Sequence, residues 1–299
     1  MENGNGNGNI TREILKKVRM LEIKTRGVVD ELFSGEYHSV FKGRGINFDE
    51  VREYHFGDDI RLIDWNVSAR FGHPYVKVYQ EERELIVMLV VDVSASGEFG
   101  SDEHTKSEIA AEISAVLAFS AMKNNDKVGL ILYTDQIELF IPPKKGKSHV
   151  LRILRELLFF KPKSKGTDIS VAMEYLNKVM KKKAIVFSIS DYWDEGFDTG
   201  LKIAGARHDF IAIRLNDKRE LELPPGNLID MIDPETGQKL LVDLGAPGLR
   251  QAYKRISEKM LKSFHDSMKR YNIDYIEVDT SGEYIGTLVK FFKMRGSRR

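Results

Sequence analysis

Oxygen-bearing side chains follow an apolar run of this chain at the point where the run ends. The run occupies residues 85–91 and is followed at once by Asp92. Ser94 and Ser96 then follow at two-residue steps, and alternate residues of an extended segment point to the same side. Carboxylate and hydroxyl oxygens are hard donors of the kind that Mg²⁺ prefers. The spacing therefore indicates a divalent-cation site.

A second apolar run ends in the same way and supplies further donors. It occupies residues 184–190 and ends at Asp191, while Thr167 lies between the two runs. If the two strands are neighbours in a parallel sheet, their terminal aspartates lie side by side in the crevice where such sheets bind ligands. Neutral hydroxyls beside two carboxylates keep the ion electrophilic, with one position open for a partner's acidic side chain. The predicted ligands of Mg²⁺ or Mn²⁺ are Asp92, Ser94, Ser96, Thr167 and Asp191.

The same residues also have an ordinary structural interpretation. An aspartate or serine after a strand often caps the following helix, which explains Asp92 and its serines equally well when they are taken alone. The addition of Thr167 and Asp191 at matching positions favours the cation site. Asp168, next to Thr167, is expected to cap a helix or to support the ligands without touching the ion.

The elements that must position these donors alternate between strands and helices from residue 85 onward. Near-continuous apolar runs are typical of parallel strands that are covered on both faces. Five such strands are expected, at residues 85–91, 128–133, 184–190, 210–215 and 274–278. Apolar residues at helical spacing lie between them. This alternation predicts an α/β fold with a doubly wound, mostly parallel sheet.

Two further elements are expected at the margins of this sheet. Residues 137–141 are typical of a short extra strand, and the prolines at 142 and 143 favour a position at the sheet edge. Residues 231–242 are typical of a hairpin that turns at residues 233–237.

The chain before residue 85 has a different character. Residues 1–9 repeat asparagine and glycine, and we expect them to form a disordered tail. Residues 10–84 are predicted to form a small N-terminal segment, with a helix over 10–35 and only short strands after it. Residues 85–299 are predicted to form the main domain.

Bulk composition excludes several classes of function. The 46 lysine and arginine residues nearly balance the 45 aspartate and glutamate residues, for a net charge of +1, so no nucleic-acid partner is expected. The absence of cysteine excludes thiolate catalysis and zinc–thiolate sites. The apolar runs are too short to span a bilayer, and the start has no secretory pattern. A cytoplasmic protein without membrane insertion is therefore expected.

Charged and aromatic residues are concentrated between residues 52 and 70. Opposite charges around aromatic rings are typical of a self-satisfied salt-bridge and stacking network, which would dock this segment on the main domain. Tryptophan, tyrosine and arginine are also frequent anchors of protein interfaces, so the segment is a second candidate for partner binding. Acid–base catalysis by the adjacent Asp58 and Asp59 is the least favoured interpretation, because neighbouring side chains normally face apart. The candidate residues are Asp58, Asp59, Arg61, Asp64, Trp65 and Arg70.

The cation motif resembles the metal-ion-dependent adhesion site (MIDAS) of the von Willebrand factor type A (vWA) domain. The likeness rests on residues 92–96, 166–168 and 190–191 and extends over about residues 85–295. It implies a doubly wound domain that binds proteins through a divalent cation.

The first part of the chain is similar to a narrower family, domain of unknown function 58 (DUF58). The similarity rests on residues 41–45, 48–54, 57–61, 63–65 and 69–70, together with the cation motif. It implies a bacterial or archaeal cytoplasmic protein that is often encoded beside a MoxR-type AAA+ ATPase. Its implied role is that of an adaptor or chaperone-like partner of that ATPase.

These observations predict a non-enzymatic, metal-dependent protein-binding module whose partner is a MoxR-type AAA+ ATPase or its client. A metal-dependent phosphohydrolase or nuclease is the alternative, since such enzymes also carry aspartates at strand ends. That alternative lacks an Asp-x-Asp pair, because position 94 is Ser94. A scaffold with a vestigial ion site is the third hypothesis.

Overall fold

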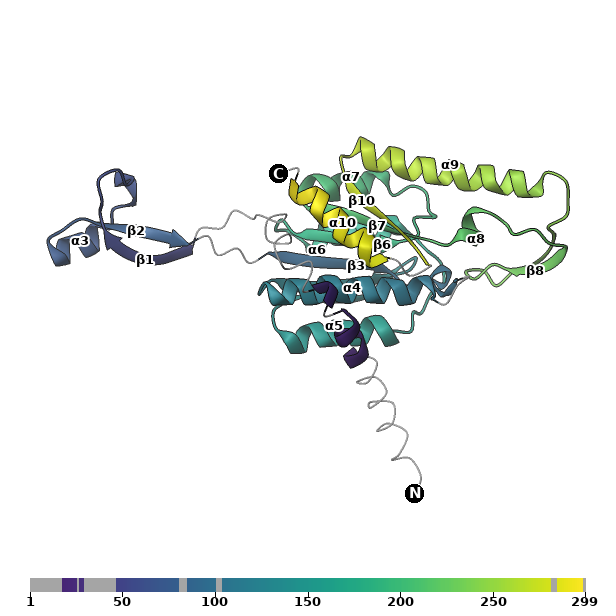
Figure 1. Cartoon of the computed structure of the whole chain (residues 1–299), viewed down its shortest axis with the longest axis horizontal. Coiled ribbons are helices and arrows are strands. Elements are labelled where there is room, and N and C mark those ends of the chain that lie inside the picture. The colour runs from purple at the N-terminus through teal and green to yellow at the C-terminus, as the bar shows by residue number, and fades with distance from the viewer. Residues whose placement is uncertain are drawn as a thin grey trace, which may run out of the picture. The chain divides into compact units, whose positions relative to one another are not determined.

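Six strands form a central sheet in the order β10-β7-β6-β3-β4-β5 (Figure 1). Their bounds are β3 (Ile86–Asp92), β4 (Lys127–Tyr133), β5 (Ile137–Lys144), β6 (Ile185–Ser190), β7 (Asp209–Asn216) and β10 (Asp274–Asp279). Neighbouring strands run parallel except β4 and β5, so β5 is an antiparallel edge strand. The predicted fold class, the five predicted strands and the predicted edge strand are confirmed.

The structure is a computed structural model, and it describes residues 18–25, 27–29, 47–80, 85–100, 104–280 and 284–297. The chain divides into a small unit, residues 41–85, and a large unit, residues 1–40 and 86–299. The sheet and the predicted cation ligands belong to the large unit. The predicted tail at residues 1–9 lies outside the described residues.

The order of the strands reverses between β3 and β6. From β3 the chain proceeds outward through β4 to β5, and from β6 it proceeds outward in the opposite direction through β7 to β10. Ligands of open α/β sheets bind at such a reversal, beyond the carboxyl ends of the strands. Asp92 is the last residue of β3 and Asp191 follows β6, so the topology places both aspartates at the switch point.

Helices cover both faces of the sheet (Figure 1). One core lies between the sheet and the helices α6 (Ile169–Val179), α7 (Asp198–Arg207) and α9 (Leu249–Arg270). On the opposite face, Phe187 of β6 packs edge-on against Phe292 of α10 (Tyr284–Ser297). The same face carries α4 (Lys106–Lys123), which packs beside α5 (Lys147–Phe159). Residues Val87 to Val91 of β3 are at most 1% exposed, as expected for a strand between two helical layers.

The helix that follows the candidate site begins where the sequence signals a start. The side chain of Thr105 accepts a hydrogen bond from the backbone N–H of Glu108, and the Glu108 side chain accepts one from Thr105 N–H. This reciprocal pair, a capping box, satisfies two N–H groups that a helix start leaves free. It fixes the first turn of α4, which carries Lys106.

Described helical residues near the N-terminus, 18–25 and 27–29, belong to the large unit, whereas the sequence grouped residues 10–84 into one segment. Their apolar side chains, such as Val18 and Leu21, are buried. Ion pairs join Lys24 to Glu112 of α4 and Glu22 to Lys147 of α5. These contacts could not be predicted from the sequence, because they join residues 88 and 125 positions apart.

The small unit consists of two antiparallel strands with a short helix between them. The strands are β1 (Asn47–Glu53) and β2 (Tyr75–Gln80), and the connection contains the 3₁₀ turn η1 (Ile60–Leu62) and the helix α3 (Trp65–Phe71). Asp64 caps α3 by accepting from the backbone N–H groups of Asn66 and Val67, and Gly72 ends it in the left-handed conformation at φ 74°. The short strands predicted for this region are confirmed.

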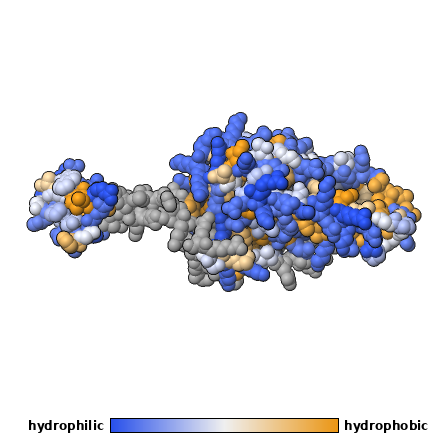
Figure 2. All heavy atoms as spheres, turned by 90° about the horizontal axis from the view of Figure 1, so that it is seen from above, coloured by the Kyte–Doolittle hydropathy of each residue, from blue (hydrophilic) through white to orange (hydrophobic). Residues whose placement is uncertain are grey.

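The predicted hairpin is also present in the large unit. It consists of β8 (Leu228–Ile232) and β9 (Lys239–Asp243), which pair with each other in a two-stranded sheet. Its exposed apolar side chains are Leu228, Ile232, Leu240 and Leu241. Figure 2 shows apolar side chains gathered at the end of the molecule where Figure 1 places β8.

Within the described residues, no helix combines the length and the apolar character that a bilayer crossing requires.

The tight packing of β4 against β3 provides a test of the core. A methyl group on Gly129 would lie 2.5 Å from the sulfur of Met88 and 3.1 Å from the carbonyl oxygen of Ile141. Gly129→Ala should therefore lower the free energy of unfolding, measured by urea denaturation, by about 1–3 kcal/mol. Gly286→Ala in α10 is the control, because its methyl group meets nothing within 4 Å. That variant should be neutral or stabilised by up to about 1 kcal/mol, and equal losses in both variants would contradict this account.

Candidate functional site

Asp92 and the two serines that follow it form the centre of the candidate site. The backbone N–H of Ser94 donates to Oδ1 of Asp92 at 2.9 Å. The hydroxyl oxygens of Ser94 and Ser96 lie 3.0 Å apart. A short 3₁₀ turn, η2 (Ala95–Glu98), follows and curls the loop back on itself. The spacing in the sequence thus brings these three side chains together, as predicted.

A serine at the end of β6 joins the neighbouring strand to this centre. Val91 of β3 is paired with Ile189 of β6, so the next residues, Asp92 and Ser190, lie beside each other. The hydroxyl of Ser190 donates to Oδ2 of Asp92 at 2.8 Å. Both oxygens of the Asp92 carboxylate are therefore oriented by hydrogen bonds from two different elements.

The segment that carries Thr167 is held against the serine loop by the backbone. The N–H of Ala95 donates to the carbonyl oxygen of Lys165 at 3.0 Å. Asp168 caps α6 by accepting from the N–H groups of Ser170 and Val171, which confirms its predicted role as a cap. The hydroxyl of Thr167 donates to Oε1 of Glu235, in the turn of the β8–β9 hairpin, at 2.8 Å. Thr167 thus lies at the rim of the site in contact with a carboxylate from elsewhere in the chain.

Asp191 is bonded to an ammonium group that the sequence did not reveal. The Nζ of Lys106 lies 2.7 Å from Oδ2 of Asp191 and 2.6 Å from Oε1 of Glu220, a residue of α8 (Lys218–Leu221). The Lys106 side chain is only 2% exposed. Burial opposes its charge, but the two carboxylates raise its pKa above the ordinary value. Lys106 therefore remains a buried cation next to the predicted metal ligands.

The other oxygen of Asp191 faces the loop after β6. The backbone N–H of Trp193 donates to Oδ1 of Asp191 at 3.2 Å. The guanidinium of the buried Arg214 donates from Nε to the backbone carbonyl of Asp191 at 3.0 Å. These contacts fix the position of the second strand-end aspartate through its backbone as well as its side chain.

The charge of Asp92 is not compensated in the same way. Two effects raise the pKa of Asp92 to about 7: burial of its carboxyl group away from water, which is the larger, and the negative charge of Asp191. Its hydrogen-bond donors, Ser94 and Ser190, are neutral. Hard carboxylate and hydroxyl oxygens around uncompensated negative charge fit a small divalent cation, which reverses such a pKa shift.

The described part of the chain holds no group of three or more histidine, cysteine, aspartate or glutamate side chains placed to bind one ion. A cation in this region would therefore depend on the two aspartates together with hydroxyl groups.

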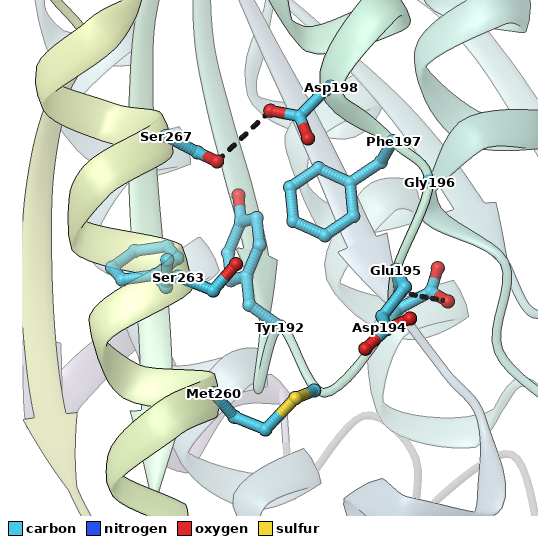
Figure 3. A pocket seen from close by; sticks show the side chains of 10 residues that line it. Tyr192, Asp194, Glu195, Gly196, Phe197, Asp198, Met260, Ser263 and Ser267 are labelled. Carbon is cyan, nitrogen blue, oxygen red and sulfur yellow. Dashed lines mark hydrogen bonds between the residues drawn. The ribbon is translucent and has the colours of Figure 1, made fainter.

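A pocket of about 240 Å³ lies beside the site, between the loop after β6 and α9 (Figure 3). Asp194 of that loop accepts from the N–H of Ile169, the first residue of α6, at 2.8 Å. Across the pocket, the hydroxyl of Ser267 donates to Oδ1 of Asp198 at 3.0 Å (Figure 3). The loop that follows Asp191 is thus tied to the start of the helix that follows Thr167.

The acidic residues predicted for partner binding in the small unit have partners inside that unit. Asp58 forms a two-point ion pair with Arg52, with both N–O distances at 2.8 Å. Asp59 accepts from the backbone and side chain of Arg61, and Asp64 caps α3. This supports the predicted internal network for the three aspartates.

The basic and aromatic members of that set lie at the surface of the small unit. Trp65 is 71% exposed, and Phe56 and Phe71 beside the same turns are also exposed. Arg61 is 87% exposed and Arg70 is exposed too. These side chains remain candidates for a contact with another protein.

Several residues of the site were not anticipated, among them Ser190, which donates to Asp92, and the charged residues Lys106, Glu220 and Glu235. Lys106 is the first residue of a helix, a position that normally indicates nothing about a site. Glu220 and Glu235 lie in a short helix and a hairpin turn, far along the chain from the aspartates. Of these charged residues, only Glu235 lay in a turn that the sequence predicted, the hairpin turn at residues 233–237. Its contact with Thr167 was not predicted.

Comparison with known proteins gives a family and several distant structural likenesses. The family described as "Protein of unknown function DUF58" matches residues 50–262. An uncharacterised protein of Mycobacterium tuberculosis is 26% identical over 283 residues, which cover 93% of this chain and 88% of that protein.

Two solved structures illustrate the structural likenesses. The conserved hypothetical protein BatB from Bacteroides thetaiotaomicron aligns with a TM-score of 0.49 and 17% identity, over 71% of this chain and 99% of BatB. The SpRpn10 VWA domain aligns with a TM-score of 0.38 and 13% identity, over 69% of this chain and 94% of that domain.

The buried lysine provides a test of the charge balance. Lys106→Met leaves Asp191 and Glu220 without their countercharge, so the free energy of unfolding should fall by about 3–5 kcal/mol. Lys24→Met is the matched control, because the Lys24 side chain is 47% exposed and its ion pair with Glu112 is screened by water. Its loss should be less than about 1 kcal/mol in the same urea titration. Comparable losses in the two variants would contradict a structural role for the buried ammonium.

The raised pKa of Asp92 predicts a pH dependence in metal-free protein. Because the native state holds this proton more tightly than the unfolded chain, Asp92 stabilises the fold at low pH and loses that contribution as the pH rises through about 7. Asp92→Asn removes the proton equilibrium. In EDTA, the wild type should therefore lose stability relative to Asp92→Asn between about pH 4 and about pH 7. Unfolding curves that keep a constant separation across this range would refute the assignment.

Proposed function

The chain belongs to the DUF58 family, and on that premise we propose that it is a metal-dependent module for binding protein partners. In this proposal the module is of the vWA type and is not an enzyme. Its adhesion site uses the five predicted ligands, acting directly or through water: Asp92, Ser94, Ser96, Thr167 and Asp191.

Asp92 is the principal ligand in this proposal. Its carboxylate is already oriented by the Ser94 N–H and the Ser190 hydroxyl, so little conformational freedom is lost when an ion binds. Each of its oxygens accepts one of these two hydrogen bonds, and a carboxylate oxygen has a second lone pair that can face a cation. The hydroxyl oxygens of Ser94 and Ser96 lie next to it and add neutral donors.

Asp191 has a more restricted role. Its two oxygens accept from Lys106 and from the Trp193 N–H. A carboxylate oxygen has more than one acceptor position, so Asp191 can still face an ion directly or through a water. The ammonium of Lys106 lowers the negative charge of the site, which favours an ion that keeps several waters over one that needs many carboxylates.

A bound Mg²⁺ would supply one electrophilic position that accepts an acidic side chain from another protein. The chain's own residues define the rest of the contact. Ser96 and Thr167 lie on two loops that a backbone hydrogen bond joins, and Thr167 contacts the turn of the β8–β9 hairpin, whose strands carry exposed apolar side chains. The partner we propose, on the resemblance noted above, is a MoxR-type AAA+ ATPase or its client.

One observation carries this proposal more than any other. At the reversal of strand order, a carboxylate from β3 lies against a hydroxyl from β6, with two further hydroxyls next to it. A simple helix cap does not need this convergence, because Asp92 does not cap α4, whose cap is Thr105.

Binding of Mn²⁺, a substitute for Mg²⁺ that is visible by electron paramagnetic resonance, tests the site. Wild-type protein should bind one Mn²⁺ that Mg²⁺ displaces, and Asp92→Ala should weaken this binding by more than about 10-fold. The wild type should also regain thermal stability in Mg²⁺ that it loses in EDTA, by the mass-action effect of a ligand that binds the native state.

Asp266→Ala is the matched control for the loss of one carboxylate. Asp266 is an exposed residue of α9 and should leave Mn²⁺ affinity unchanged. If the wild type takes up no Mn²⁺ at millimolar concentration, or if Asp92→Ala binds it equally well, the cation site is wrong.

A further inference from the structure

The turn of the β8–β9 hairpin is held in shape by its own side chains. Oδ1 of Asp233 accepts from the backbone N–H groups of Glu235 and Thr236 at 2.9 and 3.3 Å, and Oδ2 accepts from the Thr236 hydroxyl at 2.7 Å. Gly237 adopts a φ of 71°, which other residues adopt at a cost, and its N–H donates to the carbonyl of Asp233. Glu235 is therefore presented from a pre-formed turn rather than from a loose loop.

Glu235 is the point where this turn meets the candidate site. Its Oε1 accepts from the hydroxyl of Thr167 at 2.8 Å. From Ile232 to Leu241, all residues are exposed except Glu235, which is partly buried. The carboxylate is thus directed at one of the five predicted ligands of the cation.

Little else holds the hairpin against the sheet. Among the strands of the described residues, β8 and β9 pair only with each other, and a lone two-stranded hairpin is marginally stable in water. Among the hydrogen bonds and ion pairs seen between described residues, the one from Thr167 to Glu235 is the sole link from residues 228–243 to the rim of the sheet. Breaking that single contact would therefore release the turn at small cost, since one such hydrogen bond is worth about 0.5–1.5 kcal/mol.

The contact leaves the threonine able to bind a cation. The Thr167 hydroxyl uses its hydrogen to donate to Glu235, and its oxygen retains lone pairs for an ion. An ion bound to this oxygen would be a neighbour of the Glu235 carboxylate, because the same hydroxyl group contacts both. The fold does not otherwise need that carboxylate. This is the position at which the proposed function requires an acidic side chain from a partner.

We propose that Glu235 is an internal acidic ligand of the cation site, occupying the place that a partner's carboxylate takes when the hairpin opens. This inference rests on the proposed function and specifies how that site is regulated. Because Glu235 is tethered, its effective concentration at the site is on the order of millimolar. A partner must then displace it, so partner binding and opening of the hairpin are coupled.

Mn²⁺ alone tests the first half of this inference. Glu235→Gln removes the charge and keeps the size, and it should weaken Mn²⁺ binding by about 10-fold. It should also increase the enhancement of water-proton relaxation by bound Mn²⁺, because a water replaces the carboxylate. Asp230→Asn is the matched control, since Asp230 is an exposed acid on β8 of the same hairpin and should change neither quantity.

Acetate, a small carboxylate that resembles the end of an acidic side chain, tests whether the partner's position on the ion is already occupied by Glu235. Added acetate should displace water from Mn²⁺ in Glu235→Gln and should do so much less in the wild type. Hydrogen exchange gives an independent readout. Mg²⁺ should slow exchange of the amides of residues 228–243 in the wild type and in Asp230→Asn, but not in Glu235→Gln.

The outcomes separate this inference from the one on which it rests. If the wild type binds Mn²⁺ but Glu235→Gln binds it equally well, responds equally to acetate and shows the same exchange, Glu235 is not a ligand while the cation site stands. If the wild type binds no Mn²⁺, both ideas are overturned together.

Discussion

Negative charge gathered at the end of the sheet is the constraint on which this site depends. Parallel pairing of β3 with β6 places Asp92 beside Ser190, and the charge of Asp191, one residue further along, raises the pKa of the buried Asp92. The protein neutralises one of them permanently, because the ammonium of Lys106 lies between Asp191 and Glu220. Asp92 is surrounded by neutral donors and is left to bind a proton or a cation. The contrast between these two aspartates makes the site responsive rather than simply stable.

Much of this architecture was predictable because its causes are local. Strands buried on both faces need unbroken apolar runs, so β3 and β6 could be predicted from these runs alone. The start of α4 followed from Thr105 and the turn of the hairpin from residues 233–237, since both depend on side chains that bond within a few positions. The closeness of Asp92 to its serines was predictable for the same reason, as the loop between them is short.

The remainder was not predictable because it depends on which distant elements pack together. Lys106 lies 85 positions from Asp191 and 114 from Glu220, and no local pattern relates them. The contact of Thr167 with Glu235 spans 68 positions. In the small unit, the pairing of Arg52 with Asp58 is local and fits the predicted network, but the exposure of Trp65 could be learned only from the structure.

The edge strand β5 has a consequence for the protein's behaviour in a crowded solution. The outer side of an edge strand presents unpaired backbone N–H and C=O groups, with which an extended segment of another molecule can form hydrogen bonds. Pro142 and Pro143 lack amide hydrogens, and the pairing of β5 with β4 is irregular between Val128 and Leu130, opposite this stretch. Both features interrupt the ladder that a further strand would extend. The sheet is thereby protected at this margin from growing into a fibre by the addition of other molecules.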